Sequence, residues 1–220
     1  MFDFQGRYEN KNVAVLQLIY EGSTSNSNRE SLLNEFELLI QAEGFAKSFT
    51  KRAKDAELTV PGLKYNVEGA FIGTVTSYLS PGPLPLEDTI LDDERSLVHD
   101  TFLVVPLLQT KGLYKERKFS GNSETGCNGD FAGRVVDAFA HHIVEHTNGE
   151  CMLADIQGIV GPDKKITLFD PQAHTKTQTS GEWDSGISEI HKFIEEHKCN
   201  EFCKQMNLRD LSKPFPLRPW

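Results

Sequence analysis

The chain has 220 residues, enough to bury one full hydrophobic core and to split into two lobes around a cleft. Hydrophobic residues make up 38% of it, and no apolar run approaches the roughly 20 residues that cross a bilayer, so we expect a soluble globular protein. The net charge of −9 argues against general affinity for nucleic acid or for an anionic membrane, because neither attracts an acidic surface.

The N-terminus, Met1 to Gly6, lacks the positive start and the apolar stretch of a secretory signal. We therefore expect an intracellular, cytoplasmic protein whose cysteines stay reduced. Acidic residues are densest between Glu87 and Glu94, just after the proline-rich segment Ser80–Pro85. This stretch is predicted to be a solvated loop.

Apolar patterning predicts that the first half consists of strands and one long helix. The helix is expected from Asn28 as its N-cap, with basic residues at its C-terminal end. Its apolar positions are Leu32, Phe36, Leu39, Ile40 and Phe45, and its basic positions are Lys51, Arg52 and Lys54. Strands are expected at Val13–Tyr20, Leu58–Tyr65, Ala70–Leu79 and Thr101–Leu108.

The second half is predicted to hold two helical regions around a hairpin. Helical spacing indicates a helix over Phe131–His146 and another that begins near Gly186. Between them, Cys151–Gln157 and Ile166–Asp170 are expected to be strands. The intervening glycines, proline and aspartate favour a turn, so the two strands should form a hairpin.

Three good zinc ligands, His197, Cys199 and Cys203, fall within one short segment. Cys199 and Cys203 are four residues apart, so one helical turn would aim both sulfurs in the same direction. A fourth ligand would come from the helix that carries His141, His142 and His146. The alternative is that two cysteines are simply buried beside a surface histidine.

A different zinc motif is formed by His142, Glu145 and His146, which match the His-x-x-Glu-His pattern of inverted zinc proteases. Such an enzyme needs a third, acidic ligand from a separate downstream helix. Glu195 and Glu196 are the helical candidates, but they lie beside the His/Cys segment. A metalloprotease is therefore a remote alternative.

The predicted hairpin ends in polar residues. Alternation in a strand places Leu153, Asp155 and Gln157 on one face, and the returning strand ends at Asp170. Two carboxylates and an amide oxygen suit Mg²⁺, which phosphoryl transfer requires together with a carboxylate for the incoming hydroxyl. The alternative is that these strand ends only face water.

Four motifs occur in order along the second half: Ala138–His141, Asp155–Gly158, Asp170–His174 and His197–Cys203. Together they make residues 100 to 211 resemble the C-terminal lobe of the α-kinases, a family of atypical protein kinases. The resemblance implies a two-lobed α+β kinase-like domain over residues 1–211, with an N-lobe of about 1–104 and a C-lobe of about 105–211. Residues 212–220 form a proline-rich tail, which we expect to pack along the domain.

The same resemblance assigns roles to individual residues. It makes His141, His197, Cys199 and Cys203 the ligands of a structural zinc ion, and it makes Asp155 the catalytic aspartate. Gln157 and Asp170 match the Mg²⁺ ligands, and Asn122 matches an asparagine that follows the hinge. The implied cofactors are ATP, Mg²⁺ and structural Zn²⁺, and the implied partner is a protein substrate with a serine or threonine acceptor.

The first half departs from the family pattern. Leu16 occupies the place of the lysine that contacts ATP phosphates, with Lys11 as the nearest substitute, and Val105 stands where the family often has glutamate. The glycine-rich loop before the last helix is reduced to Gly181–Ile187. Two hypotheses follow: a divergent protein serine/threonine kinase, or a pseudokinase that acts as a scaffold.

Overall fold

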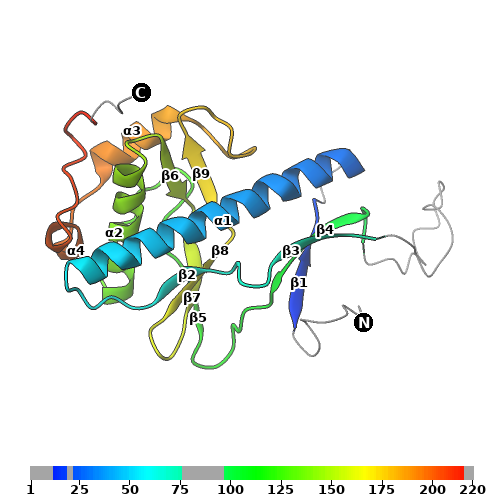
Figure 1. Cartoon of the computed structure of the whole chain (residues 1–220), viewed down its shortest axis with the longest axis horizontal. Coiled ribbons are helices and arrows are strands. Elements are labelled where there is room, and N and C mark those ends of the chain that lie inside the picture. Colours follow the sequence, from blue (N-terminus) through cyan, green and yellow to red (C-terminus); the bar gives the residue numbers. More distant parts are fainter. Residues whose placement is uncertain (1–11, 19–21, 76–96, 216–220) are drawn as a thin grey trace. The chain divides into compact units, whose positions relative to one another are not determined.

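The computed structural model describes residues 12–18, 22–75 and 97–215. The chain forms two compact units, the first from Met1–Phe36 with Gly69–Leu107 and the second from Glu37–Glu68 with Leu108–Trp220 (Figure 1). The N-lobe and C-lobe expected from the sequence meet at one boundary, near residue 105, whereas each of these units consists of two separate stretches of the chain. The lobe limits remain a prediction. No helix in the described ranges combines the length and apolar character needed to cross a membrane.

The first unit contains an antiparallel sheet with the strand order β1-β4-β3. Its strands are β1 (Val13–Leu16), β3 (Phe71–Thr74) and β4 (Thr101–Pro106). All three lie within strands predicted from the sequence but are shorter. Parts of those predictions, together with Lys11 and the segment Ser80–Glu94, fall outside the described residues.

Helix α1 spans Ser25–Asp55, so it begins before the predicted cap at Asn28. Thr24 and Ser27 cap it instead, because each backbone N–H donates to the hydroxyl of the other residue, at 2.8 Å and 3.1 Å. Asn28 is fully buried, donates from Nδ2 to the carbonyl of Thr101 at 2.8 Å and accepts from the N–H of Leu18 at 2.9 Å. It therefore ties the helix to its own unit.

The part of α1 that belongs to the second unit packs through a narrow apolar face. Phe49 is fully buried, and its ring lies edge-on to that of Phe139, with 5.6 Å between centroids. The other buried residues of this part are Leu38, Leu39, Ala42, Ala46 and Ala53. Ile40 is 49% exposed, contrary to the prediction, because it lies about 100° around the helix from Leu39.

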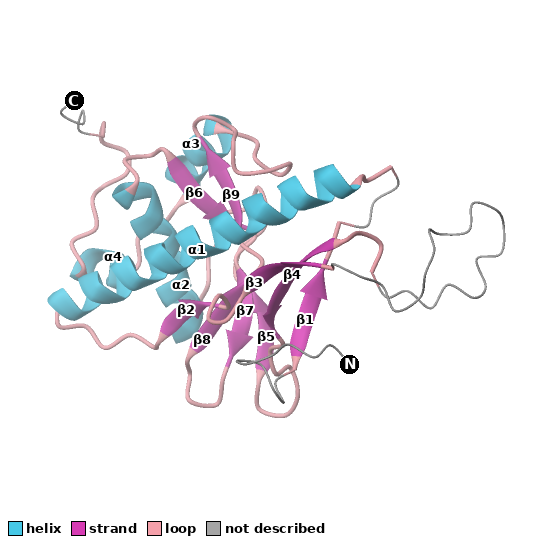
Figure 2. Ribbon diagram, turned by 45° about the vertical axis from the view of Figure 1, so that its right-hand side comes forward, coloured by secondary structure: helices cyan, strands magenta, loops and turns pink. Residues whose placement is uncertain are grey.

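The second unit has two further sheets and three further helices (Figure 2). The four-stranded sheet has the order β2-β8-β7-β5, and β6 pairs with β9 in a separate two-stranded sheet. Helix α2 packs on β6 and on α4, and α3 packs on β9. The bounds are β2 Leu63–Tyr65, β5 Lys115–Lys118, β6 Cys151–Ala154, β7 Gln157–Val160, β8 Ile166–Phe169, β9 Gln172–Thr175, α2 Phe131–His146, α3 Ile187–Glu196 and α4 Glu201–Gln205.

Helix α2 has the bounds that the sequence predicts, and capping explains them. Asp130 accepts a hydrogen bond from the N–H of Gly133 at 2.8 Å, and the helix is followed by Asn148 and Gly149 in the left-handed region. A Cβ atom on Gly149 would lie 2.7 Å from the ring of Phe215. The described start of the C-terminal tail thus packs along the domain, whereas residues 216–220 lie outside the described part.

Replacing Phe49 by alanine should lower the free energy of unfolding by about 3–5 kcal/mol, because it leaves a cavity between α1 and α2. The matched control is Ile40→Ala on the same helix, which should cost less than about 0.5 kcal/mol because this side chain is half exposed. Urea denaturation followed by circular dichroism measures both. Equal losses for the two variants would contradict the described packing of α1.

Candidate functional site

The hairpin from Cys151 to Thr175 is one ladder with an interruption. Ala154 lies opposite Gln172 in the β6–β9 pair, and Gln157 lies opposite Phe169 in the β7–β8 pair. The register is therefore the same on both sides of the break, and two residues of each strand leave the ladder between these pairs. Asp155 and Asp170 are the first residues of the two breaks.

The break corrects the predicted strand Cys151–Gln157. Asp155 has φ 48° and Asp170 has φ 49°, both in the left-handed region that L-residues seldom adopt. Asp155 and Gln157 consequently do not alternate along one strand, and the expected shared face with Leu153 does not exist. What the hairpin does bring together is its two polar ends, since Gln157 contacts Asp170.

Asp155 is held by the loop that follows β5. Its N–H donates to the carbonyl of Gly121 at 2.9 Å, and the N–H of Ile156 donates to the hydroxyl of Ser120 at 3.0 Å. The Asp155 side chain is 15% exposed, and the Lys118 ammonium forms an ion pair with its Oδ1 atom. Asp155 Oδ1 is buried and makes no hydrogen bond of good geometry. Among the described residues, the ion pair with Lys118 is the polar contact of this oxygen.

Lys118 is a site residue that the sequence analysis missed. It ends β5, which pairs with β7 so that Lys118 lies opposite Gln157. A lysine in the segment Lys115–Lys118 looks like part of an exposed charged edge strand. The signal that could have identified Lys118 is its position four residues before Asn122, at the start of the loop that the resemblance singled out.

Gln157 and Asp170 contact each other directly. The Gln157 amide donates from Nε2 to Asp170 Oδ2 at 3.0 Å. Partial desolvation of its carboxyl group raises the pKa of Asp170, although the residue as a whole is exposed, and the nearby Asp155 carboxylate raises it further. The hydrogen bond from Gln157 acts in the opposite direction. A cation beside the two carboxylates would relieve their repulsion.

Asn122 is connected to the same part of the fold through a buried histidine. His174 donates from Nε2 to the backbone carbonyl of Asn122 at 2.8 Å, and its Nδ1 accepts from the N–H of Ser185 at 3.0 Å. The side-chain oxygen of Asn122 is buried and has no hydrogen-bond partner. A buried carbonyl oxygen without a donor is the type of ligand that a hard divalent cation takes.

The residues around the hairpin break therefore fit a magnesium site in their chemistry. Oxygen ligands are available on Asp155, Asp170, Gln157 and Asn122, and oxygen atoms of Asp155 and Asn122 lack good hydrogen bonds. Gly158 allows the two strands to approach, since a Cβ atom there would lie 2.7 Å from the carbonyl of Thr167. This close approach of β7 and β8 explains why the Asp155–Gly158 motif ends in glycine.

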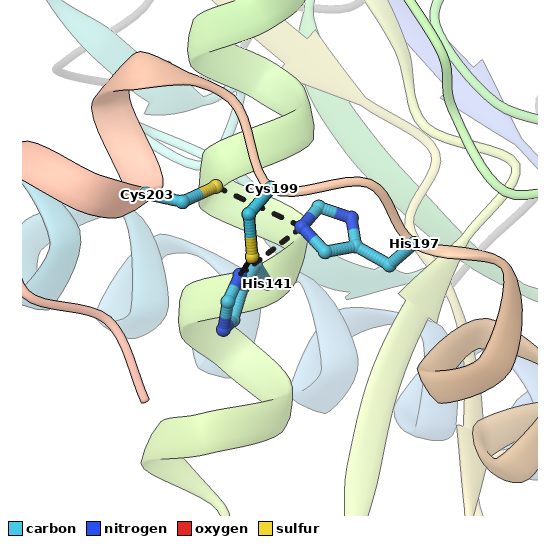
Figure 3. A group of neighbouring side chains, drawn as sticks. All are labelled: His141, His197, Cys199 and Cys203. Carbon is cyan, nitrogen blue, oxygen red and sulfur yellow. Dashed lines mark hydrogen bonds between the residues drawn. The ribbon is translucent and has the colours of Figure 1, made fainter. Parts of the chain in front are cut away.

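The four predicted zinc ligands converge in the second unit (Figure 3). His141 belongs to α2, His197 follows α3, Cys199 lies in the loop between α3 and α4, and Cys203 belongs to α4. Their ligand atoms all lie within 4.8 Å of one another. Among the described residues they are the one group of three or more His, Cys, Asp or Glu side chains that converges in this way.

The distances within this group fit a tetrahedral metal. His141 Nδ1 lies 3.1 Å from His197 Nε2 and 3.5 Å from Cys199 Sγ, and Cys203 Sγ lies 3.7 Å from His197 Nε2. Tetrahedral zinc, with bonds of about 2.0–2.1 Å to nitrogen and about 2.3 Å to sulfur, spaces its ligand atoms about 3.4–3.8 Å apart. These three spacings are close to the tetrahedral values, and the whole group, whose ligand atoms lie within 4.8 Å of one another, would contract around the ion.

Protonation of the same group also suits a metal. Burial lowers the pKa of both imidazoles, that of His197 to about 4, so their nitrogens are neutral and free to coordinate. Burial raises the pKa of both thiols, that of Cys203 to about 12. A bound cation would reverse the effect on the thiols, because a coordinating thiol loses its proton.

The structure disfavours the protease interpretation of His142, Glu145 and His146. Glu145 is paired with Arg52 through both carboxylate oxygens, at 2.5 Å and 3.2 Å. His142 is buried, and its Nε2 lies 3.1 Å from the hydroxyl of Ser48. The expected partners Glu195 and Glu196 do not join these residues in a convergent group. The three residues serve the packing of α2 on α1.

The loop Gly181–Ile187 is organised by one carboxylate. Asp184 accepts from the N–H groups of Thr175, Ser180 and Gly186 and from the hydroxyls of Thr175 and Ser180, at 2.6–3.1 Å. Partial burial acts to raise its pKa, but the hydrogen bonds from Thr175 and Ser180 lower the pKa of Asp184 to about 2. Hydrogen bonds to a charged group thus hold the shortened loop, together with Gly181 and Gly186, which both have positive φ.

In the first unit, Leu16 pairs with Leu103 at the end of β1. Across its described residues this unit contains no lysine, and its one arginine, Arg29, is exposed on α1. Gln17, next to Leu16, donates from Nε2 to the carbonyl of Thr101 at 2.7 Å and accepts from the N–H of Val98 at 2.8 Å. The end of β1 is therefore a neutral, packed element.

Comparison with known proteins places these features in one family. A sequence model described as the Alpha-kinase family matches residues 3–203. Myosin heavy chain kinase C of Dictyostelium discoideum is 32% identical over 104 residues, which cover 47% of this chain and 12% of that protein. Eukaryotic elongation factor 2 kinase of Caenorhabditis elegans is 30% identical over 112 residues, 50% of this chain and 14% of that protein.

A solved structure agrees at the level of the fold. The α-kinase domain of myosin-II heavy chain kinase A in complex with AMP-PNP matches with a TM-score of 0.61 and 20% identity, over 87% of this chain and 61% of that one. The chain spans less than a fifth of the two sequence relatives. Since the family model covers most of the sequence, the chain belongs to the alpha-kinase family.

Proposed function

We propose that this chain is the catalytic domain of an ATP-dependent protein kinase that phosphorylates serine or threonine in a protein substrate. Family membership supports the transferase activity, and the named relatives are protein kinases. The observation that carries the proposal is the paired break of the hairpin, which places Asp155, Gln157 and Asp170 together beside the Asn122 loop. A cytoplasmic location and lack of affinity for nucleic acid or membrane belong to the same proposal.

Each residue at the break has a role that suits phosphoryl transfer. Asp155 would accept the hydrogen of the substrate hydroxyl and orient its oxygen, with Lys118 fixing the carboxylate. Gln157, Asp170 and Asn122 would hold Mg²⁺, which neutralises phosphate charge when bound with ATP. The side-chain oxygens of these residues are hard ligands, which suit Mg²⁺. The repulsion between the Asp155 and Asp170 carboxylates also favours a cation beside them.

A structural zinc ion is the second part of the proposal. His141, His197, Cys199 and Cys203 would bind it as a closed four-ligand site. A closed site of this kind has no position for substrate, so its role is to join α2, the end of α3 and α4. The zinc would contribute on the order of 10 kcal/mol to folding.

The Asp155→Asn variant should lose phosphoryl transfer by at least about 100-fold, because asparagine cannot accept the hydroxyl proton. Transfer of labelled γ-phosphate to a protein or peptide mixture, followed by phosphoamino-acid analysis, measures this loss and identifies the acceptor. Asp163→Asn is the control, since Asp163 lies in the exposed turn between β7 and β8 and pairs with Lys165 at 2.7 Å. A Mg·ATP-dependent rise in melting temperature tests nucleotide binding separately.

The competing pseudokinase hypothesis gives different results in the same assays. If the unaltered chain shows neither phosphate transfer nor a shift in melting temperature with Mg·ATP, and Asp155→Asn behaves identically, the kinase proposal fails. Binding without transfer would also overturn the proposed activity and would support a scaffold that retains nucleotide. Phosphotyrosine as the only product would overturn the serine/threonine assignment.

Zinc removal should destabilise the chain. The purified protein should contain about one zinc per chain, and a strong chelator should lower its melting temperature. Cys203→Ser should abolish most of the bound zinc, because a buried hydroxyl replaces a thiolate ligand, whereas Cys127→Ser should not, since Cys127 is exposed and outside the group. Metal analysis that finds no zinc in the unaltered chain would contradict this part of the proposal.

A further inference from the structure

Arg52 and Glu145 form a two-point ion pair between α1 and α2 in the second unit. Arg52 donates from one terminal nitrogen to Glu145 Oε2 at 2.5 Å and from the other to Oε1 at 3.2 Å. The side chains are 31% and 17% exposed, so the pair is partly shielded from water. Such a bidentate arrangement fixes geometry more firmly than a single surface contact does.

The same two side chains also hold a backbone segment that is distant in sequence. Arg52 donates to the carbonyl of Met206 at 3.2 Å and to that of Asn207 at 2.9 Å. Glu145 Oε1 accepts from the N–H of Arg209 at 3.2 Å. The pair thus clamps residues 206–209, the segment that begins where α4 ends, with donors and an acceptor that match its backbone groups.

The clamped segment contacts one of the proposed zinc ligands. The carbonyl of Arg209 accepts a hydrogen bond from His141 Nε2 at 2.8 Å. Since a carbonyl can only accept, Nε2 must carry the proton, and Nδ1 is left with its lone pair. His141 Nδ1 is the nitrogen that lies 3.1 Å from His197 Nε2 and 3.5 Å from Cys199 Sγ, so the hydrogen bond turns the correct nitrogen toward the metal.

We propose that Arg52 and Glu145 are positioning residues for the zinc site, an inference that rests on the proposed binding of zinc there. They fix residues 206–209, and the Arg209 carbonyl in turn fixes the tautomer and the ring orientation of His141. This gives the glutamate of the His-x-x-Glu-His sequence a role in metal binding, but as a support that acts through Arg209 and then His141, three contacts from the ion. Loss of a group that bonds a metal ligand directly commonly weakens metal affinity about 10- to 100-fold, and here that group is the Arg209 carbonyl. Arg52 and Glu145 act through it, so their loss should have a smaller effect.

The experiment uses the zinc-loaded chain and the variants Arg52→Lys and Glu145→Gln. Lysine keeps the positive charge of Arg52 but lacks the planar guanidinium group that reaches the Glu145 carboxylate and two backbone carbonyls together. Glutamine keeps the size of Glu145 but removes its negative charge. Zinc affinity is measured by competition with a chromophoric chelator, at a temperature where circular dichroism shows every variant to be folded. We expect zinc affinity to fall by up to about 10-fold in both variants, the lower end of the effect of a direct partner of a ligand.

Two controls separate positioning from a general loss of stability. Lys51→Ala removes the neighbouring exposed ion pair with Asp55 and should leave zinc affinity unchanged. Phe49→Leu should lower stability through the α1–α2 core without touching residues 206–209. The absorption bands of the Co²⁺-substituted protein give a second readout: they should change in the Arg52→Lys and Glu145→Gln variants, and stay as in the unaltered chain in the Phe49→Leu variant.

The outcomes distinguish the two hypotheses. If the unaltered chain binds zinc and the Arg52→Lys and Glu145→Gln variants bind it with the same affinity and the same Co²⁺ spectrum, the positioning role is overturned and the zinc site stands. If affinity falls equally in Phe49→Leu at matched stability, the effect is general destabilisation and the positioning role is again overturned. If the unaltered chain binds no zinc, the site itself fails and the positioning role fails with it.

Discussion

The continuous register of the hairpin from Cys151 to Thr175 is the constraint on which the candidate active site depends. Because Ala154–Gln172 and Gln157–Phe169 belong to one register, the residues between them must leave the ladder together. Aspartate enters the left-handed region at lower cost than most residues, and Asp155 and Asp170 do so here. The ladder on each side compensates for that cost, so the strained backbone lies within the candidate site.

The backbone groups released by the break are taken up by the segment after β5. Phe119 donates to the carbonyl of Ile156 at 2.8 Å, and Gly121 accepts from Asp155 at 2.9 Å. This exchange brings Lys118 and Asn122 to the carboxylates without any further element. Buried backbone N–H and C=O groups need hydrogen-bond partners, and the groups at the break find theirs in the segment after β5. This requirement determines where the candidate site lies.

The group of His141, His197, Cys199 and Cys203 joins the C-terminal helices to α2. Helix α4 has five residues and could not persist alone in water. Asn200 caps it by accepting from Phe202 and Cys203, and the Asn200 amide donates to the carbonyl of Arg134 on α2 at 2.7 Å. A metal shared by α2, α4 and the loop between α3 and α4 would add a further restraint on this short helix.

The sequence predicts what is local and misses what is paired over a distance. Helix α2 is predicted to the residue, because an N-cap, an apolar face and a terminal Asn-Gly all lie within it or beside it. His197, Cys199 and Cys203 are suggested by spacing, whereas His141 required the family resemblance. The break at Asp155 is invisible, since an alternating pattern continues through Cys151–Gln157. Lys118 and the Arg52–Glu145 clamp depend on contacts that no local pattern encodes.

The carboxylates at the break bear on the choice between an enzyme and a scaffold. Asp155 and Asp170 repel each other, which is one reason why the pKa of Asp170 is raised, and Lys118 compensates for Asp155 alone. Replacing Asp170 by asparagine would remove this repulsion and keep an oxygen that accepts from Gln157, so folding alone does not require a carboxylate at this position. Leu16 on β1 is neutral and the described residues of the first unit include no lysine, so under the proposed function a divalent cation would supply much of the positive charge for a phosphate. Under the proposed function the Asp170 carboxylate would bind that cation, a role that phosphoryl transfer requires and a scaffold does not.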